Sequence, residues 1–239
     1  MTLIGITTLL LAVAGTLAGT GPDKGVRRLA DFPRQPTEIR EWMKQHDWKS
    51  KRNSPRDFEL ADGQLHLVSR DDSVLIGTRK GLALDPQEWP LLRFRLRVDE
   101  NPRGMDLTRK SGDDAAFRIY VAFDRGGGLF SPPNTIAYTW TEDLKPDSLV
   151  RSAHFKRLRY MSIGKGVTHE GSPAAAGTDA WVTIERDLVE DYRRAFPEER
   201  GPVPDFVGFM LKCDSNNTGT SASAWLSDLE LVSPERRDG

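Results

Sequence analysis

Hydrophobic and polar residues alternate along the chain from residue 58 onward, a pattern typical of β-strands that bury one face. Residues 91–98 and 115–123 show it most clearly, because polar side chains occupy one face and hydrophobic side chains the other. Further strands are expected at 64–70, 73–78, 135–141, 159–163, 181–187, 206–213 and 224–231. The strands at 64–70 and 73–78 are expected to form a hairpin that turns at Asp71 and Asp72.

Only two short helices are predicted. One covers 188–196, where Asp187 can cap the first turn and Pro197 ends the helix. The other lies near the N-terminus at 37–45, with Thr37 as its expected cap. Many short strands and few helices favour an antiparallel β-sandwich or jelly roll over alternating β and α units. We therefore predict an all-β domain at 58–233, followed by a disordered tail at 234–239.

The N-terminal region differs from the rest of the chain. Residues 3–18 form the only long apolar run, which is short for a membrane span and suits a signal peptide at 1–18. We therefore expect an exported protein, periplasmic or extracellular, with no membrane span after cleavage; a retained N-terminal membrane anchor is the alternative. Residues 19–57 form a basic lead-in, because 24–56 hold ten basic and four acidic residues. This segment is either a solvated lead-in or a patch that attracts an acidic polymer.

Overall composition excludes several classes of protein. The formal net charge of −1 provides no general attraction to nucleic acid, so a dedicated nucleic-acid binder is not expected. Cys213 is the only cysteine, which excludes an intramolecular disulfide and a multi-cysteine zinc site. With 38 % hydrophobic residues, the chain can bury a sizeable core. No cofactor is required by any motif in the sequence.

Five segments occur in a characteristic order. They are DDAAFRIYVAF at 113–123, TIAYTW at 135–140, WVTIERD at 181–187, DYRRAF at 191–196 and DSNNTG at 214–219. In this order the chain resembles the bacterial domain of unknown function 3047 family over about residues 58–231. The resemblance implies a galactose-binding-like β-jelly-roll, an architecture shared by many carbohydrate-binding modules. It brings no established activity with it.

The segment 214–219 concentrates oxygen donors in a short loop. Asp214, Asn216 and Asn217, together with Asp228 in the following strand, could bind calcium, which takes six to eight oxygen ligands. Alternatively, the side chains bond their own backbone in an Asx turn. The loop has a single carboxylate, which favours the turn.

A second set of residues could bind a ligand on one sheet face. Aromatic rings stack on the apolar faces of sugars, and arginines donate paired hydrogen bonds to hydroxyls or carboxylates. The candidate ligand-binding residues are Arg95, Arg118, Tyr120, Tyr138, Trp140 and Glu185. Tyr138 and Trp140 alternate in phase with Ile136, so both are alternatively core residues, and the arginines are alternatively part of a solvated face.

Catalytic signals are few. The sequence has no nucleophile elbow, no phosphate-binding glycine loop and no zinc-protease motif. A glycosidase needs two carboxylates across a cleft, for which Asp113 or Asp114 with Glu185 could serve. Our first hypothesis is a non-catalytic exported module that binds carbohydrate or a related envelope polymer, so that its expected partner is a glycan or an anionic polymer. The alternatives are a glycan-active hydrolase or lyase on the same scaffold, or a structural interaction protein.

Overall fold

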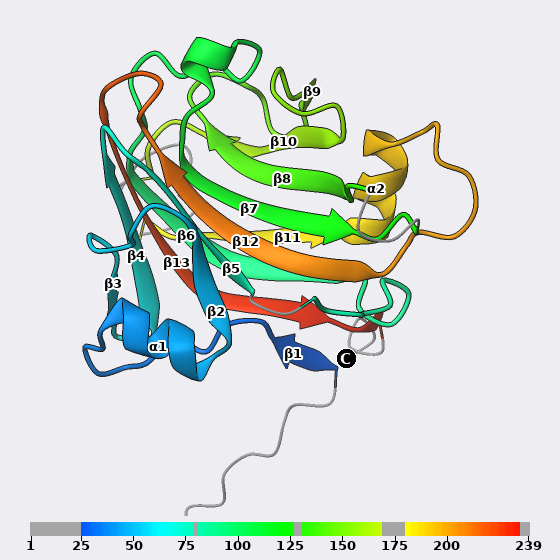
Figure 1. Cartoon of the computed structure of the whole chain (residues 1–239), viewed down its shortest axis with the longest axis horizontal. Coiled ribbons are helices and arrows are strands. Elements are labelled where there is room, and N and C mark those ends of the chain that lie inside the picture. Colours follow the sequence, from blue (N-terminus) through cyan, green and yellow to red (C-terminus); the bar gives the residue numbers. More distant parts are fainter. Residues whose placement is uncertain (1–24, 79–80, 127–130, 169–179, 235–239) are drawn as a thin grey trace, which may run out of the picture.

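The computed structural model describes residues 25–78, 81–126, 131–168 and 180–234 as two β-sheets packed face to face (Figure 1). The predicted all-β sandwich of the jelly-roll type is therefore confirmed. The expected signal peptide at 1–18 lies outside the described residues, as does nearly all of the predicted tail. Among the described residues, no helix is long and apolar enough to cross a membrane.

The first sheet has six strands. Their order is β11 (Val182–Asp187), β6 (Leu91–Glu100), β13 (Ser221–Val232), β4 (Gln64–Arg70) and β3 (Glu59–Ala61), with β1 (Val26–Arg28) also paired to β13. The second sheet has seven strands. Their order is β2 (Trp48–Arg52), β5 (Ser73–Thr78), β12 (Phe206–Asp214), β7 (Ala115–Phe123), β8 (Asn134–Thr141), β10 (Leu158–Lys165) and β9 (Leu149–Arg151).

Three features of this topology differ from the expectations. The strands β4 and β5 have the predicted bounds but enter different sheets, so they are not a hairpin. The pair β8 and β10 is parallel, which departs from a purely antiparallel sandwich. The basic segment expected as a solvated lead-in contributes β1 to one sheet and β2 to the other. The described residues before 58, from 25 onward, therefore contribute strands to the sandwich.

The core lies between the sheets and follows the predicted alternation. In β7, Phe117, Ile119 and Val121 are fully buried against the six-stranded sheet. In β6, Phe94 and Leu96 meet them from the other side, and the rings of Phe94 and Phe117 lie 5.4 Å apart. The intervening residues of β7 point to the outer face of the seven-stranded sheet.

Two short helices flank the sandwich. Helix α2 (Leu188–Ala195) is capped as predicted, because the Asp187 carboxylate accepts hydrogen bonds from the backbone N–H groups of Val189 and Glu190 at 3.0 Å. Helix α1 (Ile39–Gln45) begins after Thr37, which does not cap it. Thr37 forms an extended β-bridge with Leu60 instead, and its hydroxyl donates to the Gln35 carbonyl at 3.0 Å.

Candidate functional site

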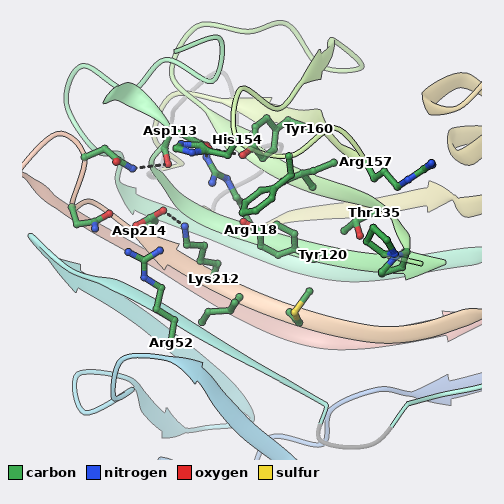
Figure 2. A pocket seen from close by; sticks show the side chains of 18 residues that line it. Arg52, Asp113, Arg118, Tyr120, Thr135, His154, Arg157, Tyr160, Lys212 and Asp214 are labelled. Atoms are coloured by element: carbon green, nitrogen blue, oxygen red, sulfur yellow. Dashed lines mark hydrogen bonds and ion pairs between the residues drawn. The ribbon is translucent and has the colours of Figure 1, made fainter. Parts of the chain in front are cut away.

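A cavity of about 500 Å³ opens on the outer face of the seven-stranded sheet (Figure 2). Strands β5, β7, β8, β10 and β12 supply its floor, and residues of the loops at 132–133 and 154–157 supply part of its wall. The volume falls within the usual range for small-molecule sites. The cavity is therefore large enough to hold a small ligand.

The register of the strands places large and small residues alternately across the floor. Tyr120 in β7 lies beside Met210 in β12 on one side and Ala137 in β8 on the other. Ala137 is followed by Tyr160 in β10, and Met210 by Gly77 in β5. Because neighbouring strands are only about 4.8 Å apart, two large side chains side by side would fill this space. The small residues leave the two tyrosines apart and keep the row open.

The next row along the same strands is charged. Arg118 of β7 lies beside Lys212 of β12, which lies beside Leu75 of β5, and Leu75 is paired with Arg52 of the edge strand β2. All four side chains line the cavity. The floor therefore combines an aromatic row with a parallel row of cations.

A buried ion pair forms the centre of the charged row. Arg118 is only 1 % exposed, and its Nη2 lies 2.7 Å from Asp113 Oδ1. The Tyr160 hydroxyl donates to Asp113 Oδ2 at 2.6 Å, and the Arg118 guanidinium lies 4.7 Å from the centre of the Tyr160 ring. His154 Nε2 is 3.6 Å from Asp113 Oδ2. Residues from two loops and two strands are thus held in one network.

The protonation states in this network follow from burial and charge. Burial by itself lowers the pKa of the Arg118 guanidinium, but four neighbouring groups together raise it by more, so the net shift is upward; they are Tyr120, Asp113, Tyr160 and Asp214. Burial also raises the pKa of the Tyr160 hydroxyl well above its ordinary value. Arg118 therefore stays charged, and Tyr160 keeps the proton that it donates to Asp113.

Three buried polar atoms of cavity-lining residues have no hydrogen-bond partner in the described protein: Arg118 Nε, a donor, and Asp113 Oδ1 and Asp214 Oδ1, two acceptors. Asp113 Oδ1 forms the ion pair with Arg118, which leaves Arg118 Nε and Asp214 Oδ1. The other oxygen of Asp214 pairs with Lys212 Nζ. Because buried polar groups are nearly always hydrogen-bonded in proteins, this donor and this acceptor are suited to a polar ligand.

The loop at 214–219 is held by Asp114, which the sequence did not indicate. The Asp114 carboxylate accepts hydrogen bonds from Asn217 N at 3.2 Å, Asn217 Nδ2 at 2.8 Å and Thr218 N at 2.7 Å. Asn217 Nδ2 also donates to the Asp113 carbonyl at 3.1 Å. The loop is therefore a tight connection fastened to the start of β7.

The candidate calcium ligands do not converge. Asp214, Asn216 and Asn217 line the cavity, but Asp214 is paired with Lys212, and Asn217 is bound to Asp114. Asp228 lies in a bulge of β13, in the other sheet. No group of three or more histidine, cysteine or acidic residues is placed to hold a metal within the described ranges. This geometry does not fit a calcium ion on the four residues, and calcium binding stays a prediction.

The six candidate ligand residues are divided among three places. Arg118 and Tyr120 line the cavity. Tyr138 and Trp140 lie in the core, because they point to the same face of β8 as Ile136. The Tyr138 hydroxyl donates to Asp191 at 3.0 Å. Arg95 and Glu185 lie on adjacent strands of the six-stranded sheet. The expected single patch therefore does not form.

The same separation applies to the proposed catalytic pair. Asp113 is in the cavity and Asp114 holds the loop, whereas Glu185 is on the six-stranded sheet. Sequence reasoning also missed cavity residues that come from strands with ordinary patterns, above all Tyr160, Met210 and Lys212. The alternation of side chains along each strand was a usable signal, because each of these residues follows or precedes a residue of the core. This alternation does not show which strands lie side by side.

Comparison with known proteins identifies a family for this sequence. Residues 40–230 match the family described as protein of unknown function (DUF3047). No curated protein matches the sequence.

Solved structures with a similar fold are distant. An agarase, AgWH50C, aligns with a TM-score of 0.36 and 13 % identity over 87 % of this chain, which spans only 24 % of that enzyme. A cellulase derived from Cel12A of Rhodothermus marinus aligns with a TM-score of 0.40 and 12 % identity, and the alignment covers 79 % of this chain and 92 % of the cellulase. The xyloglucanase domain of NopAA, a type three effector from Sinorhizobium fredii, aligns with a TM-score of 0.40 and 7 % identity. That alignment covers 85 % of this chain and 97 % of the xyloglucanase domain. At such low scores and identities, we draw nothing about the site from these structures.

Proposed function

The chain belongs to the DUF3047 family, and from its cavity we propose that it is a carbohydrate-binding protein. One observation carries the proposal: the row of Tyr120 and Tyr160 lies directly beside the row of Arg118 and Lys212, and both line the same cavity. Sugars present an apolar ring face and a polar rim. Aromatic side chains fit the first, and charged hydrogen-bonding groups fit the second.

The polar atoms in the wall support this choice of ligand. A sugar hydroxyl both donates and accepts a hydrogen bond, so it can serve the unpartnered Arg118 donor and the unpartnered Asp214 acceptor. The ion pairs with Asp113 and Lys212 fix these two side chains in place before a ligand arrives. Groups that are already ordered lose less entropy on binding.

Binding is favoured over hydrolysis by the state of the two carboxylates in the cavity wall. A glycosidase needs one carboxyl group as acid and a second as base or nucleophile. Asp113 is engaged by Arg118 and Tyr160, and Asp214 is engaged by Lys212. Hydrolysis or lyase chemistry by Asp113 and Asp214 is the second candidate, because both carboxylates line the same cavity.

We further propose that the protein acts outside the cytoplasm. The support is the apolar run at 3–18, which has the length of a signal-peptide core. N-terminal sequencing of protein recovered from the cell envelope tests this proposal. A chain that still begins at residue 1, or that stays in the cytoplasm, would contradict cleavage and export.

A glycan array tests the binding proposal. We expect wild-type protein to bind a defined subset of glycans, and Tyr120→Leu to weaken that binding about tenfold by removing an aromatic surface. Trp181→Leu is the matched control, because it removes an aromatic ring that packs against Arg95 of the six-stranded sheet, away from the cavity; its binding should stay within about twofold of wild type. Each variant is melted first to show that it is folded.

Three results decide between the alternatives. Absence of binding to any glycan, or equal losses in both variants, would sink the proposal. Release of shorter sugars from a bound glycan would favour the enzyme. Repeating the array and the melts with a calcium chelator tests the metal prediction, and we expect no change because Asp114 fastens the loop.

A further inference from the structure

The edge strand β2 brings cations to the rim of the cavity. Its sequence is Trp-Lys-Ser-Lys-Arg at 48–52, and everything after Trp48 is exposed. Arg52 lines the cavity, close to Asp214 and Lys212 in Figure 2. Lys49 lies further along the same strand and lines a second hollow beside α1.

A bulge in β2 turns two of these cations to the same face. Lys49 is paired with Gly77 of β5, but Arg52 is paired with Leu75, because the register shifts by one residue between Ser50 and Arg52. Gly77 and Leu75 share a face, so Lys49 and Arg52 share it too. In an unbroken strand, residues three apart would point to opposite faces. Bulges commonly re-aim a side chain in this way next to binding sites.

These cations are not neutralised by the protein. Within the described part of the chain, Lys49, Lys51 and Arg52 form no ion pair with a carboxylate. Burial and the charge of Lys49 lower the pKa of Lys51, which shows that the like charges are close enough to interact. Like charges placed together destabilise a strand. An anionic ligand would offset this repulsion.

The charge continues on both sides of β2. The cavity is lined by four arginine and lysine residues and two aspartates, an excess of two positive charges. The hollow between β2 and α1, about 460 Å³ in volume, is lined by Arg40, Lys44 and Lys49 and by no acidic residue. Helix α1 and strand β2 lie side by side in Figure 1. Both hollows therefore favour negative charge.

We propose that the ligand is a linear acidic glycan that lies across β2, with one part in the cavity and another in the hollow beside α1. This rests on the proposed carbohydrate binding and specifies its substrate class. Carboxylate groups on the sugar units would pair with Lys49 and Arg52, while the tyrosine row holds the sugar rings. Nucleic acid fits less well, because Asp113 and Asp214 lie in the cavity wall and the net charge of the chain is −1.

The test compares two ligands that differ only in charge. The probes are hexameric oligogalacturonate and its fully methyl-esterified, uncharged form, titrated into the full-length wild-type protein at low salt. We expect the acid to bind about tenfold more tightly than the ester, since two or more exposed charge pairs are gained. The double variant Lys49→Gln/Arg52→Gln should lose most of that preference and bind the ester as wild type does. Raising the salt concentration should weaken binding of the acid alone.

The matched control is Arg27→Gln/Arg103→Gln. It removes the same charge at two exposed arginines that line neither hollow, so the preference for the acid should persist. Equal affinity of wild type for both probes, or an unchanged preference in the β2 variant, would overturn the acidic-glycan inference while leaving glycan binding in place. Binding of neither probe, nor of any glycan on the array, would overturn the proposed function itself. Equally tight binding of single-stranded hexathymidylate would show a general polyanion surface and overturn the assignment to a glycan.

Discussion

The outer faces of the two sheets carry similar side chains but differ in what surrounds them. On the six-stranded sheet, the rings of His66 and Trp225 stack at 4.0 Å, and Arg97 lies 4.8 Å over Trp225. Arg97 and Arg95 also lie over Trp181, at 5.8 and 5.3 Å. The Trp225 indole N–H donates to Asp99. Aromatic and cationic groups on this face contact each other.

On the seven-stranded sheet, small residues separate the large ones. Ala137 stands between Tyr120 and Tyr160, and Gly77 stands beside Met210. On the six-stranded sheet, stacked side chains fill the space above the strands. On the seven-stranded sheet, the corresponding space is a cavity. Arginines and aromatic rings therefore do not by themselves mark a binding site. The size of the residue paired on the adjacent strand decides whether the arginines and rings contact each other or remain available to a ligand.

The largest expected effect compares an arginine from each face. Arg118→Ala leaves Asp113 buried without its cation, so we expect the free energy of unfolding to fall by about 3–5 kcal/mol. Arg97→Ala breaks a partly exposed pair with Asp99 and removes the contacts with Trp225 and Trp181, so it should cost about 1–2 kcal/mol. Urea unfolding of both variants measures the difference. Equal losses would show that the two faces are held in the same way.

A smaller effect compares two glycines of the seven-stranded sheet. A Cβ on Gly77 would lie 2.6 Å from Met210 Cγ and 2.8 Å from the Phe209 carbonyl oxygen, so Gly77→Ala should cost about 1–3 kcal/mol. At Gly208 the nearest atom is Thr78 Oγ1 at 3.5 Å, an ordinary contact, and Gly208→Ala should change stability by less than about 1 kcal/mol. Thermal melts distinguish the two. A harmless Gly77→Ala would mean that the row tolerates larger residues.

The smallest expected effect is on the pH dependence of stability, and it concerns His66 on the outer face of the six-stranded sheet. Burial, assisted by Arg97, lowers the pKa of His66 below its ordinary value of 6.5, although Glu59 and Asp99 act in the opposite direction. The folded protein then binds fewer protons at His66 than the unfolded chain does, so stability falls as the pH drops below about 6.5. His66→Gln should lose less stability than wild type between about pH 7 and about pH 5. Identical profiles of stability against pH for wild type and His66→Gln would show that His66 does not cause the loss of stability at low pH.

The sequence predicts strands well because alternation is a local property. The bounds of β4, β5 and β7 agree with the predicted ranges, and α2 is capped by the expected Asp187. Pairing is not local. The chain bends at Asp71, but it crosses there from one sheet to the other and does not form the expected hairpin turn. Nothing in the alternation of 64–78 distinguishes a crossing from a hairpin.

The candidate site was only partly predictable for the same reason. Parity placed Arg118 and Tyr120 on one face of β7, and the structure puts both in the cavity. Parity could not show that Arg95 belongs to the other sheet. The role of Arg52 depends on a bulge, and the support of the 214–219 loop depends on Asp114, about a hundred residues earlier in the sequence. Contacts across such distances exist only once the sheets have formed.

The position of β13 has a consequence for how the chain is made. Among the strands that the structure describes it is the last in sequence, yet it lies in the middle of its sheet, between β6 and β4, and it also receives β1. Until the ribosome has released it, the strands on either side have no common partner, and the sandwich cannot close. Closure of the sandwich is therefore delayed until β13 has been made, and until then the growing chain stays open with unpaired strands. An unfolded chain of this kind is the form that can be threaded through a narrow membrane pore, which agrees with the export that we propose.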